Sequence, residues 1–373
     1  MATQLKYQVQ LNSDNEGRDR RCYAVYLGND KVGIVFDTYP TTVFYMVEIS
    51  SGKILWTQKD YACFGKVSWP IYDGNISYLA LRSGQNRCLG AHDSVTGEQL
   101  WLNKLSNSQF QFMVPLVQTK DYVAVCNTQA EKIALVDKIT GKIASRVKLK
   151  HYLYDYEPNL VAWVEKFIAV APIKKREKSY VIDLYDPKEP EGFVRTITEA
   201  ISSDMCRHTI VDDFFFYFTS TGDFYKVDLN DGEVKQHEKL NSESSFSRII
   251  SHEDGKLYCA FGKDEQFYLF TYDLAGGQVK VTPIEIDDEE SINYGNVLPI
   301  CGAEGYLLWE KGIMKYDLAK GGDREKVVLE GFDKVVAGDS LMRHTKDYNE
   351  NWLVAENHLL TIAEDGQLRC REI

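Results

Sequence analysis

The chain has 373 residues, and its 43 lysines and arginines against 55 aspartates and glutamates give a formal net charge of −12. A hydrophobic fraction of 44% and a charged fraction of 26% are typical of a folded protein and exclude an intrinsically disordered one. The acidic balance also disfavours nucleic acid as a partner, because phosphate backbones are repelled.

The sequence predicts no membrane segment. No uncharged apolar run approaches the roughly 18 residues that a membrane helix needs, and residues 1–19 contain no apolar signal-peptide core. Eight cysteines are dispersed without a CxxC motif or an adjacent pair, so we expect free thiols rather than disulfides. These features predict a reducing compartment, most simply the cytoplasm.

An acidic residue followed four positions later by glycine recurs about every 45 residues. The pairs are Glu48–Gly52, Asp93–Gly97, Asp137–Gly141, Asp228–Gly232, Asp273–Gly277 and Asp317–Gly321. Asp183, in VIDLYDPKEPEG, is taken as the remaining member, with a longer turn. We interpret the motif as a turn device, in which the acidic side chain caps the backbone and glycine supplies a positive φ. A metal or catalytic role is the alternative.

Alternating, β-branched and aromatic runs surround each motif, and about four such strands per unit are typical of a propeller blade. We therefore predict an all-β fold, with residues 1–373 forming one eight-bladed β-propeller of four-stranded antiparallel blades. The predicted blades are 22–60, 67–105, 114–149, 159–198, 209–240, 248–286, 297–330 and 352–373. The last has three strands of its own, and the N-terminal strand 4–11 is expected to complete it and close the ring. This alignment places Arg371 where Asp317 stands one unit earlier.

Two repeats resemble a known family. GAHDSVTGEQLW at 90–101 and VEISSGKILW at 47–56 are similar to the AxDxxTGxxxW repeat of pyrroloquinoline-quinone (PQQ) type propellers. The resemblance implies that Trp56 and Trp101 dock between neighbouring blades, whereas Ser145, Gln236 and Val281 hold that offset later in the chain. The best-known members are periplasmic dehydrogenases with PQQ and calcium in the central channel, beside an adjacent-cysteine disulfide that this sequence lacks. A second branch consists of outer-membrane assembly scaffolds.

No pattern in the sequence predicts catalysis. The seven histidines show no metal-ligand spacing, and neither a GxSxG elbow nor a phosphate-binding loop is present. We therefore expect no catalytic residues, no metal and no cofactor.

The loops suggest a binding surface. In a propeller, the turns between second and third strands share a face, here called the loop-rich face, with the connections between blades. We expect a basic sector on this face, an acidic sector opposite it, and three tyrosines that alternate along one segment. The basic residues are Arg82, Arg87, Lys174, Lys175, Arg176 and Lys178, the acidic residues are Asp287, Asp288, Glu289 and Glu290, and the tyrosines are Tyr152, Tyr154 and Tyr156. Ordinary solvated loops and core-filling aromatics are the alternative.

The sequence thus favours a non-catalytic scaffold that binds a protein partner through its loop-rich face, either as a monomer or as a subunit of a larger complex. The alternative is a ligand-binding or enzymatic propeller that holds a small molecule or cofactor in its central channel. A purely structural subunit of a large assembly is a third possibility.

Overall fold

The computed structural model describes most of the chain as β-structure. The described residues are 2–3, 5–11, 20–38, 41–61, 70–83, 86–106, 113–127, 132–150, 159–172, 180–189, 192–201, 205–219, 221–240, 245–246, 250–263, 266–284, 300–301, 303–309, 312–321, 323–329, 352–362 and 366–373. Every regular element among them is a β-strand, and none of these residues belongs to a helix that is long and apolar enough to span a membrane.

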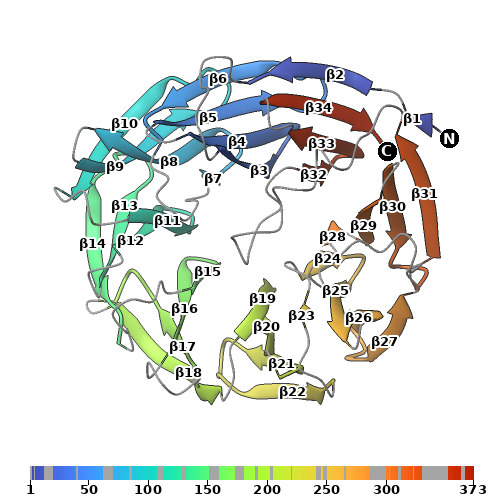
Figure 1. Ribbon diagram of the computed structural model, residues 1–373. Helices are drawn as coiled ribbons and strands as arrows, with labels where there is room; N and C mark the ends of the chain where they lie inside the picture. The colour runs from blue at the N-terminus through green and yellow to red at the C-terminus, as the bar shows by residue number, and fades with distance from the viewer. Residues whose placement is uncertain are drawn as a thin grey trace.

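Eight sheets are arranged in a ring, and each sheet runs outward from an inner strand (Figure 1). The predicted fold class, an eight-bladed β-propeller, is confirmed. In most blades the four strands follow one another in chain order from the centre to the rim, so each blade is a meander of short hairpins.

Blades 1 to 4 follow the predicted order along the chain. Their strands are β3 (Arg20–Gly28), β4 (Lys31–Thr38), β5 (Thr41–Glu48) and β6 (Ile54–Lys59); β7 (Ile71–Tyr72), β8 (Ile76–Ser83), β9 (Asn86–Asp93) and β10 (Gln99–Ser106); β11 (Met113–Gln118), β12 (Tyr122–Asn127), β13 (Lys132–Asp137) and β14 (Ile143–Lys148); and β15 (Asn159–Trp163), β16 (Lys166–Pro172), β17 (Tyr180–Tyr185) and β18 (Phe193–Ile201).

Blades 5 to 8 complete the ring, and two short strands, β23 and β24, form the inner side of blade 6. The strands are β19 (Met205–Val211), β20 (Phe214–Thr219), β21 (Asp223–Asp228) and β22 (Val234–Lys239); β23 (Ser245–Phe246), β24 (Ser251–Glu253), β25 (Lys256–Lys263), β26 (Gln266–Asp273) and β27 (Val279–Ile284); β28 (Ile300–Cys301), β29 (Glu304–Trp309), β30 (Gly312–Asp317) and β31 (Asp323–Leu329); and β32 (Trp352–Ala355), β33 (His358–Ile362), β34 (Gln367–Glu372) and β2 (Leu5–Gln10).

The N-terminal segment closes the ring, as predicted. Strand β2 pairs antiparallel with β34, and the amide of Leu11 continues the pairing by donating to the carbonyl of Gly366 at 3.0 Å. The sequence did not predict the preceding strand, β1 (Ala2–Thr3), which pairs in parallel with the outer strand of blade 7. The first residues of the chain therefore span the outer edges of two neighbouring blades (Figure 1).

The acidic residue of the repeat ends the third strand of a blade and organises the turn that follows. In blade 2, Asp93 accepts hydrogen bonds through Oδ1 from the amides of Val95 and Thr96, at 2.9 and 2.7 Å. The amide of Gly97 donates to the Asp93 carbonyl at 2.9 Å, and its φ of +74° is strained for any residue with a Cβ. These hydrogen bonds hold the pKa of Asp93 below its usual range.

Blade 4 departs from the predicted motif. Asp183 lies inside β17, where it is buried and accepts a hydrogen bond from the Thr196 hydroxyl at 2.8 Å. The turn begins instead at Asp186, whose amide donates to the carbonyl of Gly192 at 2.8 Å and whose side chain accepts from the amide of Lys188. The strand register is determined by which residues pair across the sheet, so the regular 45-residue spacing predicted the wrong aspartate.

The last blade also has an acidic residue at this position. Glu372 ends β34 and pairs with His358 in the way that Asp317 pairs with Glu304 in blade 7. The alignment that placed Arg371 there is one residue out of register, and Arg371 is buried.

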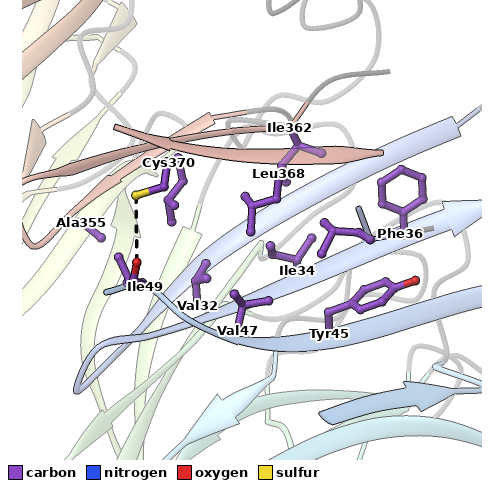
Figure 2. Close-up of a cluster of buried hydrophobic side chains, with 12 residues drawn as sticks. Val32, Ile34, Phe36, Tyr45, Val47, Ile49, Ala355, Ile362, Leu368 and Cys370 are labelled. Carbon is purple, nitrogen blue, oxygen red and sulfur yellow. Dashed lines mark hydrogen bonds between the residues drawn. The ribbon is translucent and has the colours of Figure 1, made fainter. Parts of the chain in front are cut away.

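Apolar side chains fill the spaces between adjacent blades. Figure 2 shows the cluster that joins blade 8 to blade 1, in which Ile34 and Val47 of blade 1 meet Leu368 and Cys370 of blade 8. All four side chains are fully buried, and the Cys370 thiol lies 4.0 Å from the carbonyl oxygen of Ile49, to which it donates a weak hydrogen bond. The ring is thus closed by a core as well as by strand pairing.

Candidate interaction surface

The two faces of the ring carry different turns. In each antiparallel blade, the turns from the first to the second strand and from the third to the fourth lie at one end. The turn from the second to the third strand lies at the other end, together with the connection to the next blade, and this end is the loop-rich face.

Most of the predicted interaction residues lie outside the described part of the chain. These are Tyr152, Tyr154, Tyr156, Lys174, Lys175, Arg176, Lys178, Asp287, Asp288, Glu289 and Glu290. They remain predictions. Arg82 and Arg87 are described, and both lie at the loop-rich end of blade 2.

Arg82 and Arg87 are directly opposite each other on β8 and β9. Arg82 is exposed, and its amide donates to the carbonyl of Asp60 at 2.8 Å, which joins β8 to the segment arriving from blade 1. Arg87 is only 3% exposed. Its pKa is lowered by burial and, to a smaller extent, by the positive charge of Arg82.

A third cation approaches from the outer strand. Lys104 of β10 pairs with Cys88 of β9, next to Arg87, and its side chain is exposed. Burial raises the pKa of the Cys88 thiol, while the charges of Lys104 and Arg87 act in the opposite direction. Arg82 and Arg87 lie on one face of blade 2, whereas Lys104, opposite Cys88, lies on the other face, so the three cations of this end do not form a single cluster.

Only one of the two arginines is accessible. Arg87 is 3% exposed, whereas Arg82 is exposed, and an exposed guanidinium group can match a carboxylate or phosphate with two parallel hydrogen bonds.

The two predicted docking tryptophans reach the turn of the next blade. The indole Nε1 of Trp56 donates to the carbonyl of Ser94 at 3.0 Å, and that of Trp101 donates to the carbonyl of Lys138 at 2.9 Å. Trp56 is buried and also stacks on His92, with ring centroids 5.8 Å apart. In both places the acceptor is the residue that follows the acidic turn residue.

Other side chains make comparable contacts where tryptophan is absent. Arg195 of blade 4 donates through its guanidinium to the carbonyl of Leu229 at 2.6 Å, and Gln236 of blade 5 donates to the carbonyl of Gly277 at 3.0 Å. Only a donor aimed at a backbone carbonyl is required, so a search for tryptophan misses them. At the junction of blades 6 and 7 the offset residue Val281 is 41% exposed.

Blade 5 carries an aspartate–histidine pair that the sequence did not reveal. His237 Nε2 lies 2.9 Å from Asp223 Oδ1, and the hydroxyl of Thr221 donates to the other carboxylate oxygen at 2.7 Å. The His237 ring stacks on Tyr225, with centroids 4.3 Å apart, and Tyr225 stacks on Tyr217. Although burial raises the pKa of Asp223, its hydrogen bonds with His237 and Thr221 bring it below the usual value.

The Asp223–His237 pair joins residues 14 positions apart, and only the pairing of β21 with β22 brings them together. Once the strands are aligned, that cross-strand register is the signal that identifies the pair from sequence. Among the residues that the structure describes, no three histidine, cysteine, aspartate or glutamate side chains form a group suited to a metal ion.

Sequence comparisons find no match, whereas structural comparisons find proteins of similar fold. No protein-family model and no curated protein matches the chain. Its structure is similar to that of the computationally designed Ika8 protein, with 14% identity, 96% of this chain and 98% of that chain covered, and a TM-score of 0.59. It is also similar to BamB from Moraxella catarrhalis, with 13% identity, 99% of each chain covered and a TM-score of 0.55.

A third similar structure is Hsv2 from Kluyveromyces lactis, with 9% identity, 83% of this chain and 100% of that chain covered, and a TM-score of 0.50. At such low identities a structural likeness concerns the fold, because one fold serves many functions. These comparisons therefore identify the chain by its architecture, an eight-bladed β-propeller.

Proposed function

We propose that this propeller is a non-catalytic scaffold that binds a protein partner through its loop-rich face. The observation that carries the proposal is the exposed Arg82 at that face, directly opposite Arg87 in the sheet. An exposed guanidinium can bind a carboxylate through two parallel hydrogen bonds. The neighbouring positive charge of Arg87 adds to the attraction that Arg82 exerts on an acidic group.

The partner is proposed to present carboxylates to this end of blade 2. Opposite charges steer two proteins together and set their relative orientation more than they raise affinity. The predicted basic residues between 174 and 178 are proposed to extend the same surface.

We also propose that the chain belongs to the PQQ-type propellers. Its support is the AxDxxTGxxxW pattern together with the contacts that Trp56 and Trp101 make across blades. The proposed location is the reducing interior of the cell. Three described cysteines, Cys88, Cys259 and Cys370, are buried as free thiols, which supports that location.

The test is partner capture with a matched charge reversal. The protein and two variants, Arg82→Glu and Lys142→Glu, are expressed in the cells of origin, cross-linked and purified at low salt, and the attached proteins are quantified by mass spectrometry. Lys142 is an exposed cation of blade 3 on the opposite face, so its variant makes the same charge change elsewhere. We expect Arg82→Glu to lower capture of the partner, more at low salt than at high salt, and Lys142→Glu to preserve it.

Equal capture by the three proteins would contradict a role for the loop-rich face of blade 2. Native mass spectrometry of the same samples tests the alternative function. A stable additional mass of small-molecule size, with no protein attached, would favour a ligand in the central channel.

A further inference from the structure

The outer strand of blade 2 exposes two large apolar side chains. An outer strand has one unpaired edge, and proteins usually protect such edges with charged side chains. Among the described residues, the outer strands of blades 4, 5, 6 and 7 each expose one large apolar side chain, namely Val194, Val234, Val281 and Val328. In the described sheets β10 pairs with β9 alone, yet it exposes two leucines.

Leu102 and Lys104 occupy alternate positions of β10 and therefore lie on one side of the strand, and Leu100 precedes them at the register shift between Gln99 and Trp101. Leu100 is 49% exposed and Leu102 is 44% exposed. Val95, in the turn that precedes β10, is 58% exposed. The outer rim of blade 2 thus presents two exposed leucine side chains next to the positive charge of Lys104.

The intervening residues hold β10 in place. Trp101 donates to the carbonyl of Lys138 at 2.9 Å, and Asn103 donates through its side-chain amide to the carbonyl of Gly141. Because these alternate side chains are fixed to blade 3, the strand is ordered before anything binds to its edge. A preordered edge lowers the entropic cost of adding a strand.

This molecule already adds a strand to the rim of another blade. The two residues of β1 pair in parallel with Val328 and Leu329 of β31, which otherwise is the outer strand of blade 7. The outer edge of a blade in this propeller therefore accepts an additional extended segment (Figure 1).

We infer that the edge of β10 binds an extended segment of a partner protein as a fifth strand of blade 2. The segment carries an apolar residue opposite Leu102, a carboxylate at the next alternate position, opposite Lys104, and a second apolar residue two positions away on the other side, near Leu100. Cross-strand apolar pairs and opposite-charge pairs are the contacts that stabilise neighbouring strands. This inference goes beyond the proposed function, since it concerns the rim rather than the loop-rich face.

The test uses two synthetic fluorescein-labelled peptides and the full chain. Thr-Val-Thr-Val-Thr-Glu-Thr has the order required for parallel pairing, and Thr-Glu-Thr-Val-Thr-Val-Thr has the order for antiparallel pairing. Fluorescence anisotropy measures binding, and hydrogen exchange locates it. We expect one of the two peptides to bind and to slow the exchange of β10 amides.

The variants separate the two kinds of contact. Leu100→Lys and Leu102→Lys are each expected to weaken binding about fivefold, the upper range for one cross-strand pair. Lys104→Glu is expected to weaken binding similarly and to reverse the preference, so that a peptide with Lys in place of Glu binds better. Val234→Lys is the matched control, because Val234 is 46% exposed on the outer strand of blade 5.

Several outcomes would overturn the inference. These are failure of both peptides to bind at millimolar concentration, binding that is insensitive to Leu102→Lys, and an unchanged charge preference in Lys104→Glu. If the chain itself forms a dimer that Leu102→Lys dissolves, the edge belongs to a second copy and not to a different protein. None of these results bears on Arg82, so the proposed function stands or falls separately.

Discussion

The phenol of Tyr7 donates a hydrogen bond to the backbone carbonyl of Ile49 at 2.7 Å. Tyr7 lies on the closing strand β2, and Ile49 follows the acidic turn residue of blade 1, so the bond joins the last blade to the first. Trp56 and Trp101 bind the same turn position in blades 2 and 3. Burial and the Cys370 thiol raise the pKa of Tyr7, which keeps the phenol protonated as a donor.

Replacing Tyr7 should measure the contribution of this bond. Tyr7→Phe is expected to lower the free energy of unfolding by about 1 kcal/mol, since it removes one hydrogen bond and keeps the ring. Tyr7→Ala is expected to cost about 3 kcal/mol, because the ring packs against the cluster shown in Figure 2. Urea denaturation measures both. Gln8→Ala on the same strand is the control and should stay within about 0.5 kcal/mol of the parent protein.

Deleting residues 1–11 should open the ring. The deletion exposes the edge of β34 and part of the core between blades 8 and 1, so we expect aggregation and a clear fall in Tm. Deleting residues 1–3 removes β1 alone and should have a small effect. Size-exclusion chromatography and thermal unfolding follow both variants. A ring that is equally stable without residues 1–11 would contradict closure by β2.

Two glycines allow the docking contact to be separated from backbone strain. Gly97 has φ of +74° and Gly255 has φ of +71°, so alanine is strained by about 1–2 kcal/mol at either position. A Cβ on Gly97 would lie 2.5 Å from Cγ of Trp56, whereas a Cβ on Gly255 meets nothing within 4 Å. Gly97→Ala is therefore expected to destabilise the protein by about 2 kcal/mol more than Gly255→Ala.

Equal destabilisation by the two alanine variants would mean that Trp56 moves away at little cost. Combining Gly97→Ala with Trp56→Ala provides the check, because the clash disappears with the indole. In the Trp56→Ala background, Gly97→Ala should lower the free energy of unfolding by no more than Gly255→Ala does in the parent protein.

His92 should make stability dependent on pH. Its ring is 1% exposed, and burial lowers its pKa to about 4. The unfolded chain, with a histidine pKa near 6.5, takes up the proton first, so the free energy of unfolding falls as pH decreases from about 6.5 to about 4. The full loss is about 3 kcal/mol.

The measurement is urea denaturation at several pH values between 4 and 7, for the parent protein and for His92→Gln. The variant has its own stability at pH 7, and only its slope with pH is compared. If the free energy of unfolding of His92→Gln falls with decreasing pH as steeply as that of the parent protein, His92 does not cause the pH dependence.

The repeat predicted the blades well because a turn needs particular residues. In blades 2, 3, 5, 6 and 7 an aspartate that ends the third strand accepts hydrogen bonds from amides of the turn that follows, and a glycine with positive φ lies four positions later. The motif failed at Asp183, where a longer turn containing Pro187 moves the turn residue to Asp186. Strand register depends on pairing across the sheet, and a constant spacing along the chain does not represent it.

The interaction surface was less predictable. The opposition of Arg82 and Arg87 follows from a hairpin that the alternating pattern indicates, whereas the exposure of Leu100 and Leu102 depends on how blades 1 and 2 meet. Strand β1 has two residues, which is too short for any periodic pattern. Contacts of this kind depend on packing between distant segments, and a single sequence gives no signal for them.

Ring closure also governs when the protein can fold during its synthesis. Lys6 and His358, which lie 2.8 Å apart across blade 8, are separated by 352 positions along the chain. At about 5–20 residues per second, β2 leaves the ribosome roughly 20–70 s before its partner strand exists. Throughout that time strand β2 has no partner strand, and blades 1 to 7 form an open arc and not a closed ring. Nascent chains therefore need either protection of this segment or slow, late assembly of the whole ring.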